Sequence, residues 1–395
     1  MNMNSIPHQI LKEFDVIKTF EIGGSSAKTL LVEDKRCHRK CILKYSTWGG
    51  IGSSGLPWLK AQCKRFRELG SIKNHIIQDS LPTILDEYEG KSLYFYLMEY
   101  FPNSYPISFY YYQKRQNVVE LKEKIDAVIS LLMKLYQIQL ISPPSNFAHD
   151  VHIKRMIHRT NLLTNTNTIV YNKVLRNRPI FFSKFKFTDL TDLFSEIKKY
   201  QVIYINGKKH RNFPTLLPEI DNELILSSIQ PNVLPKYYHG DSTLRNYLLF
   251  NSGIKIIDIR GTDLPGYVVS KIDIAYELGK IVRTFYLEII RNNDFYIDLV
   301  EKGTKLSFGF IFNKVVSASS FIDVRSVFLK SIKKYQDEHE ILKMENNLLV
   351  KVLYAEAAHF IADAVNRIES DISGKQTIAY YLLGLQLYDE LLRRS

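Results

Sequence analysis

The chain contains little cysteine, with Cys37, Cys41 and Cys63 as its three cysteines among 395 residues. So small and odd a number excludes a disulfide framework and favours a reducing compartment. Cys37 and Cys41 have the spacing of a zinc-ligand pair, but the sequence provides no second pair nearby, which disfavours a zinc site.

Long apolar runs are also lacking. No run approaches the roughly 20 residues that a membrane-spanning helix needs. Residues 1–14 contain no apolar core of signal-peptide length. We therefore expect a cytoplasmic protein with no transmembrane segment, soluble or peripheral to a membrane.

Hydrophobic residues make up 45% of the chain and aromatic residues 12%. This content is enough for the core of two domains or of one two-lobed unit. Its net charge of +12 favours an anionic partner such as a nucleotide, a sugar phosphate or an acidic lipid. A solvated, lysine-rich surface is the alternative. The absence of a nucleic-acid fold signature makes nucleic acid an unlikely partner.

The motif with the most chemical content runs from His239 through Asp241 to Asn246, followed by Asp258. Phosphoryl transfer needs a carboxylate that orients and deprotonates the attacking hydroxyl, and oxygen ligands for a metal ion. Two apolar runs separated by a turn, within residues 247–257, predict a β-hairpin between the asparagine and the second aspartate. A tight turn whose aspartate caps local backbone donors is the structural alternative.

This segment resembles the catalytic loop of the aminoglycoside phosphotransferase/choline kinase family, which has His-Gly-Asp where protein kinases have His-Arg-Asp. The resemblance implies an α+β, two-lobed protein-kinase-like fold that uses ATP and Mg²⁺. It places a small antiparallel-sheet, nucleotide-binding lobe at residues 1–101 and a large, mostly helical catalytic lobe at residues 102–395. By the same resemblance Asp241 is the catalytic base, His239 braces the loop, and Asn246 and Asp258 bind the metal.

A narrower similarity points to kinase-like domains of bacterial surface-polysaccharide clusters. It rests on the stretch from Asp258 to Gly261 and on the Asp-x-Ala segment that begins at Asp273. Ile259 replaces the proline of that pattern. The Asp-x-Ala segment implies that Asp273 caps or braces the helix that follows.

The region before the motif predicts the nucleotide-binding half. Three strands are expected, at residues 17–22, 28–33 and 40–46. The turn between the first two resembles the phosphate loop of the same family and comprises Gly23, Gly24, Ser25 and Ser26. In the third strand, alternation puts Ile42 and Lys44 on one face, where Lys44 would contact phosphates and Ile42 would cover the base.

Lys44 needs a partner, because a lysine in an apolar strand is costly to desolvate. Glu68 is the one acidic residue between positions 45 and 78, in a helix expected over residues 57–69. We therefore predict a Lys44–Glu68 ion pair as in kinases, with a surface position for Glu68 as the alternative.

A hairpin is expected at residues 83–87 and 92–100. The residues at its end resemble the hinge that holds adenine in kinases and comprise Met98, Glu99 and Tyr100. An edge strand that ends before Pro102 is equally compatible with this pattern. The glycine-rich residues 47–56 predict a loop that closes over phosphates.

Helical periodicity follows at residues 119–140, stopped by Pro143. An insertion at about 145–235 mixes basic and aromatic residues, so it either builds the substrate side of the cleft or forms a solvated basic face. Within this insertion, His149 and His152 have a spacing that metal-ligand pairs also show, but a helix cap or a turn is the favoured interpretation. Further helices are expected over residues 270–291, 319–337, 341–369 and 375–393.

These features favour an ATP- and Mg²⁺-dependent small-molecule kinase whose acceptor is a hydroxyl group. The basic insertion argues for a sugar or glycan-related acceptor over cationic ones. The alternatives are a choline/ethanolamine or aminoglycoside kinase and a nucleotide-binding pseudokinase. A protein kinase is disfavoured, because the loop has the His-Gly-Asp form and no Ala-Pro-Glu segment follows Asp258. No sequence feature specifies an oligomeric state.

Overall fold

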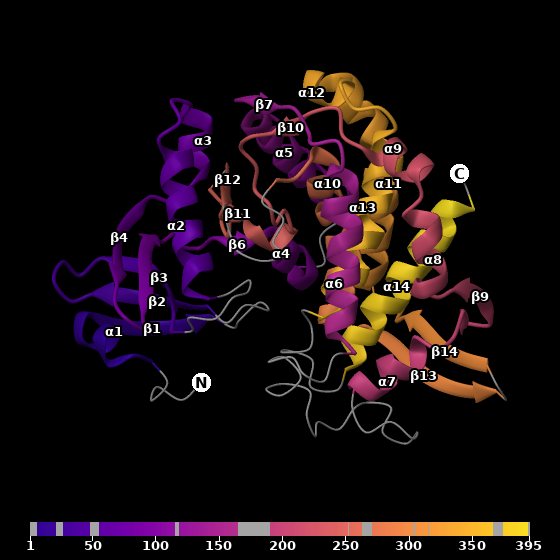
Figure 1. Cartoon of the computed structure of the whole chain (residues 1–395). Coiled ribbons are helices and arrows are strands. Elements are labelled where there is room, and N and C mark those ends of the chain that lie inside the picture. The colour runs from indigo at the N-terminus through magenta and orange to yellow at the C-terminus, as the bar shows by residue number, and fades with distance from the viewer. Residues whose placement is uncertain are drawn as a thin grey trace. The chain divides into compact units, whose positions relative to one another are not determined.

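The chain is seen here in a computed structural model (Figure 1). The structure describes residues 6–20, 27–47, 55–114, 118–164, 190–251, 253–262, 271–302, 305–314, 316–365 and 374–393. The chain forms two compact units. Unit 1 consists of Met1–Tyr110, Ala127–Leu135 and Tyr237–Lys271, and unit 2 consists of Tyr111–Asp126, Tyr136–Lys236 and Ile272–Ser395.

Unit 1 is built on a five-stranded antiparallel sheet of order β1-β2-β3-β5-β4. The strands are β1 Phe14–Phe20, β2 Lys28–Asp34, β3 Lys40–Ser46, β4 Ile84–Glu89 and β5 Tyr94–Glu99. Phe95 and Leu97 pack on the face that carries Ile10 of helix α1 (His8–Glu13). Tyr96 and Met98 alternate with them and pack with Leu59 on the opposite face.

Helix α2 (Leu56–Gly70) connects β3 to the second half of this sheet and covers that opposite face. Pro57 lies in its first turn, where a missing backbone N–H has no cost. Helix α3 (His75–Ser80) follows, and the Asn74 side chain caps it by accepting from the backbone N–H groups of Ile76 and Ile77. The predicted helix at residues 57–69 is confirmed.

A second, three-stranded sheet in unit 1 has the order β12-β11-β6. The hairpin of β11 (Tyr247–Phe250) and β12 (Gly253–Ile256) is antiparallel, with Tyr247 opposite Ile256, so the predicted hairpin is confirmed. Strand β6 (Tyr105–Pro106) pairs with β11. A single 3₁₀ turn, Leu244–Asn246, leads into the hairpin.

Helices α4 (Ile107–Lys114) and α5 (Val118–Tyr136) each contribute residues to both units. Helix α5 ends four residues before its predicted end. The chain leaves it at Tyr136 because Leu140–Ile141 forms strand β7, which pairs with β10 (Leu234–Pro235).

Within the described residues, ten helical segments lie wholly in unit 2. They are η2 His149–Lys154, α6 Arg155–Leu162, α7 Leu190–Ile197, α8 Phe213–Ile220, α9 Glu223–Ile229, α10 Ile274–Arg291, α11 Val316–Glu338, α12 Glu340–Lys343, α13 Leu348–Asp363 and α14 Lys375–Leu392. The predicted helix at 341–369 is interrupted, because Asn347 takes a left-handed conformation (φ 53°) between α12 and α13. None of the described helices is long and apolar enough to cross a membrane.

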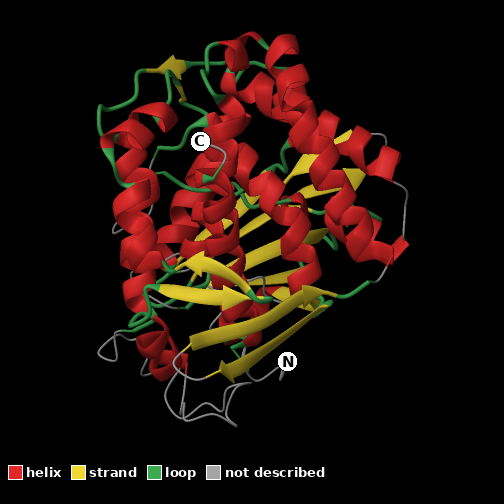
Figure 2. Cartoon of the chain, turned by 90° about the vertical axis from the view of Figure 1, so that its right-hand side faces the viewer, coloured by secondary structure: helices red, strands yellow, loops and turns green. Residues whose placement is uncertain are grey.

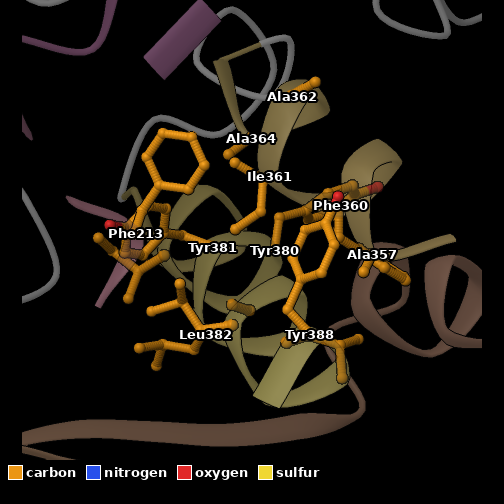
Figure 3. Close-up of a cluster of buried hydrophobic side chains, with 14 of the residues drawn as sticks. Phe213, Ala357, Phe360, Ile361, Ala362, Ala364, Tyr380, Tyr381, Leu382 and Tyr388 are labelled. Carbon is orange, nitrogen blue, oxygen red and sulfur yellow. The ribbon is translucent and has the colours of Figure 1, made fainter. Parts of the chain in front are cut away.

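The core of unit 2 lies where α10, α13 and α14 pack together. Phe360 and Tyr380 meet edge to face with ring centroids 5.4 Å apart, and Ile361 contacts α14 at Gly384, where a Cβ would lie 2.8 Å from the isoleucine side chain (Figure 3). A larger residue at position 384 would push the two helices apart.

A four-stranded sheet of order β13-β14-β8-β9 completes unit 2. Its strands are β8 Val202–Ile205, β9 Lys208–Arg211, β13 Phe295–Lys302 and β14 Lys305–Phe312. The chain beyond Asp273 is mostly helical, as predicted, but the two strands at residues 295–312 were not predicted. The whole chain is α+β, as predicted (Figure 2).

The two histidines of the insertion, His149 and His152, lie in a helix of unit 2. His149 begins a π-helix rather than the expected cap or turn. His152 is buried against the rings of Tyr276 and Tyr354, and burial lowers its pKa to about 3. A neutral histidine in an aromatic contact is a core residue.

Candidate active site

The candidate site lies within unit 1, and His239 is at its centre with no exposed surface. Its Nδ1 accepts from the backbone N–H of Asp241 at 3.1 Å, and its Nε2 lies 3.0 Å from the carbonyl oxygen of Ile257. These partners require a neutral ring that carries its proton on Nε2. The His239 carbonyl accepts from the N–H of Arg260 at 2.7 Å. The histidine thus joins the Asp241 loop to the chain that follows β12.

Gly240 is required by its surroundings. Its φ is +82°, and a Cβ would lie 2.4 Å from the Cβ of Arg260. A side chain is therefore excluded both by backbone conformation and by space.

Asp241 and Asn246 are held together by a local turn. The Asn246 Nδ2 donates to the backbone oxygen of Asp241 at 2.8 Å and to its Oδ2 at 3.2 Å. The backbone N–H of Thr243 also donates to the Asp241 carbonyl, at 2.7 Å. Because Nδ2 donates to Asp241, the amide oxygen of Asn246 is the atom that would bind a cation.

Asp258 is brought to the same place by the hairpin. The N–H of the preceding residue, Ile257, donates to the carbonyl of Asn246 at 2.9 Å. Asp258 has a φ of 57°, a left-handed conformation that aspartate tolerates better than most residues but still adopts at a cost. Backbone strain retained beside a carboxylate motif is typical of a functional position.

Lys44 meets Asp258 directly. Its Nζ contacts the Asp258 carboxylate and lies 3.0 Å from Oε1 of Gln62, and the lysine is 7% exposed. The prediction of a Lys44–Glu68 ion pair is therefore wrong. Glu68 instead contacts Lys64 and Arg65 of its own helix, at 4.0 and 3.1 Å.

The helix geometry explains why Glu68 does not reach Lys44. Residues 62 and 68 are six positions apart, which is a rotation of about 240° around a helix. Gln62 points toward β3, so Glu68 faces elsewhere. Gln62 was not predicted from the sequence, because the partner of Lys44 was expected to be acidic. A signal existed, since Gln62 occupies the buried stripe of α2 formed with Leu59, Cys63 and Phe66.

Helix α2 also packs closely on the chain after Asp258. A Cβ at Gly261 would lie 2.5 Å from the Cβ of Ala61, so this glycine allows backbone contact. Nearby, the guanidinium of Arg260 lies over the ring of Trp58 at 5.8 Å. The guanidinium of Arg65 lies over Tyr238 at 5.1 Å. The helix is thereby fixed against the segment that carries the second aspartate.

The predicted base-binding residues lie on two neighbouring strands. Ile42 and Met98 are directly opposite in the β3–β5 register, next to the Lys44–Tyr96 pair. Glu99 contacts the backbone N–H and hydroxyl of Thr83, both at 3.3 Å. The predicted hinge roles of Met98, Glu99 and Tyr100 stay predictions. Gly23, Gly24, Ser25 and Ser26 and most of the 47–56 loop lie outside the described residues.

The oxygen atoms at this site suit Mg²⁺, which prefers carboxylate and amide oxygens. Among the described residues no group of three or more histidine, cysteine, aspartate or glutamate side chains could hold a metal ion. A metal here would therefore depend on the Asp258 carboxylate, the Asn246 amide and ligands from a bound phosphate. Such partial coordination is usual for magnesium in phosphoryl-transfer sites.

No protein-family model matches the chain, and no curated protein matches it in sequence. Among solved structures, the chain is similar to an aminoglycoside-3'-phosphotransferase of type VIII. The two share 12% identity over 84% of this chain and 93% of that chain, with a TM-score of 0.34.

Proposed function

We propose that the protein is an ATP- and Mg²⁺-dependent phosphotransferase that phosphorylates a hydroxyl group of a small molecule. The observation that carries the proposal is the convergence of four residues in unit 1. Lys44 contacts Asp258, the hairpin links Asp258 to Asn246, and the Asn246 amide contacts Asp241. This set combines a cation for phosphates, two metal ligands and a base.

In this proposal each residue has a positional or electrostatic role. Asp241 orients the acceptor hydroxyl and takes its proton as the phosphoryl group transfers. Asn246 and Asp258 would hold the metal ion, which would neutralise charge on the phosphates. Lys44 aligns the phosphates, and neutral His239 keeps the Asp241 loop against the hairpin. Catalysis then depends on preorganised groups and no covalent intermediate.

For the acceptor we propose a sugar or a glycan-related metabolite. The support is the basic character of the chain, which does not favour polycationic aminoglycosides or choline. Part of the basic insertion has partners of its own, since Arg211 contacts Glu219 and Asp389 and His210 lies 3.3 Å from Asp389. The preference for a sugar acceptor therefore follows from the overall charge of the chain.

The test is an ATP-consumption screen against sugars, amino alcohols, nucleosides and aminoglycosides, with Mg²⁺ present and with EDTA. We expect turnover with a hydroxyl-bearing acceptor, dependent on Mg²⁺ and absent in Asp241→Ala. Nucleotide binding without transfer to any acceptor would contradict the kinase proposal and favour a nucleotide-binding scaffold. Preferred turnover of aminoglycosides or choline would contradict the proposed acceptor class alone.

A further inference from the structure

Gln62 is a polar residue in the apolar interior of unit 1, with 3% of its surface exposed. An amide in such a place is stable only when its polar atoms have partners. The Gln62 Oε1 accepts from Nζ of Lys44 at 3.0 Å and from the hydroxyl of Tyr96 at 2.7 Å. Its Nε2 donates to the carbonyl oxygen of Ile259 at 2.9 Å.

The three partners come from separate parts of the unit. Lys44 lies in β3, Tyr96 in β5, and Ile259 in the segment that follows β12. Burial, and then the charge of Asp258, hold the pKa of Tyr96 well above its usual value, so its hydroxyl remains a donor. One amide therefore links the strand of the phosphate-binding lysine to the chain beside the metal-binding aspartate.

The chemistry of these contacts selects an amide over a carboxylate. A glutamate at position 62 would accept from Lys44 and Tyr96 equally well. It would have no donor for the Ile259 carbonyl, and two acceptors would then face each other in a buried place. The neutral amide also leaves Asp258 as the carboxylate that Lys44 contacts among the described residues.

We propose that Gln62 is a positioning residue that holds Lys44 and the Asp258–Gly261 segment in one arrangement. This inference rests on the proposed function, in which Lys44 aligns phosphates and Asp258 binds the metal. Because Gln62 adds no charge, Lys44 and Asp258 neutralise each other, and bound phosphates and a metal ion would have to replace that contact in one exchange. Gln62 keeps both groups in place during the exchange.

The test compares Gln62→Met, Gln62→Glu and a matched control, Gln78→Glu. Methionine keeps the length of the side chain and removes all three hydrogen bonds. Glutamate keeps an acceptor for Lys44 and Tyr96 and removes the donor to Ile259. Gln78 is an exposed residue of α3 in the same unit, where it donates to the Gly70 carbonyl.

The first measurement is hydrogen exchange of the Arg260 amide, which donates to His239. Exchange should accelerate about tenfold in both Gln62 variants and remain unchanged in Gln78→Glu. This measurement needs neither nucleotide nor acceptor, so it tests the positioning of the segment even if no acceptor is ever phosphorylated. Unchanged protection in both Gln62 variants would overturn the inference.

The second measurement separates KM from kcat. Both Gln62 variants should raise the KM for MgATP about tenfold and leave the KM for the acceptor unchanged. A fluorescent ATP analogue, titrated with Mg²⁺ and with EDTA, gives the same comparison from binding alone. If Gln62→Glu bound the nucleotide with wild-type affinity, Lys44 would need only a hydrogen-bond acceptor at position 62. The inferred role of the hydrogen bond from Gln62 to Ile259 would then be wrong. If Gln62→Met lowered the melting temperature but kept the wild-type KM for MgATP, Gln62 would have only a structural role, and the inference would also be wrong.

Discussion

Gly240 and Asp258 both have left-handed backbone conformations, on either side of the residues that hold the candidate site together. The glycine adopts this conformation freely, whereas the aspartate does so at a cost of about 1 kcal/mol or more. Both conformations are fixed by the contacts of His239, which joins the two segments. His239 therefore holds the Asp241 loop and the Asp258 segment together.

Gly240→Ala should destabilise unit 1 by roughly 3 kcal/mol, because a Cβ meets Arg260 and the left-handed conformation disfavours alanine. The free energy of unfolding in urea measures this effect. Gly253→Ala is the matched control, since a Cβ there would meet only the Phe250 carbonyl at 3.7 Å. Equal losses for the two variants would show that the contact with Arg260 is unimportant.

Asp258→Asn keeps the shape of the side chain and the tolerance for a left-handed backbone while removing its charge. We expect the Mg²⁺ dependence of nucleotide affinity to disappear and transfer to fall at least ~100-fold. ATP in EDTA should bind as tightly as to the wild type or more tightly, because Lys44 loses its counter-charge. Asp86→Asn, an exposed change on β4, serves as the control. Retained Mg²⁺ dependence in Asp258→Asn would refute its assignment as a metal ligand.

The grouping of Asp241, Asn246 and Asp258 was predictable because a short turn and a hairpin connect them, and both have local sequence signals. Lys44 was predictable as a lysine in an apolar strand. The partner of Lys44 on helix α2 was not predictable. Charge complementarity indicates that the partner should be acidic, but it does not indicate which face of the helix points toward the lysine. Gln62 can be predicted as a partner only from its place among the buried residues of α2, because it has no charge.

At the scale of elements, helix α10 shows how a cap can carry a pH dependence. The Asp273 side chain caps the helix by accepting from the Tyr276 N–H at 2.9 Å, as predicted. Burial raises the pKa of Asp273 to about 7. Between pH 4 and 7 the folded protein therefore keeps a proton that the unfolded chain releases, so stability falls as the pH rises through this range.

Asp273→Asn should remove this contribution and keep the cap, because an asparagine oxygen can also accept from Tyr276. The stability of the wild type relative to Asp273→Asn should fall by up to about 1.4 kcal/mol per pH unit between pH 4 and 7, and level off above it. Chemical unfolding across that range measures the difference. Asp323→Asn, at an exposed position of α11, is the control. Parallel pH curves for wild type and Asp273→Asn would contradict the raised pKa.

Long helices with a clear period, such as α10 and α14, were predicted, whereas strand β14 was not. Residues 305–312 alternate, with Leu306, Phe308 and Phe310 buried, so the missed strand had a readable pattern. The helix break at Asn347 had a weaker signal, because asparagine alone does not specify a left-handed residue.

At the scale of the whole molecule, unit 1 joins segments that are far apart in the chain. Lys44 and Gln62 come from its first part and the His239–Gly261 region from its last. Short motifs in the correct order indicated Lys44 and the residues from His239 to Asp258, whereas the contacts that Gln62 makes between them depend on tertiary packing. Unit 2 supplied fewer predictions of function, because its insertion has no motif with a defined chemistry.

We propose that Asp241 acts as the base of a phosphoryl-transfer site. The most direct test measures MgATP affinity and phosphoryl transfer together in Asp241→Ala, with thermal unfolding as a check of the fold. We expect an affinity within about threefold of the wild type and a loss of transfer of roughly a thousandfold, which is the effect of losing a general base. Transfer at the wild-type rate in a folded Asp241→Ala protein would contradict it.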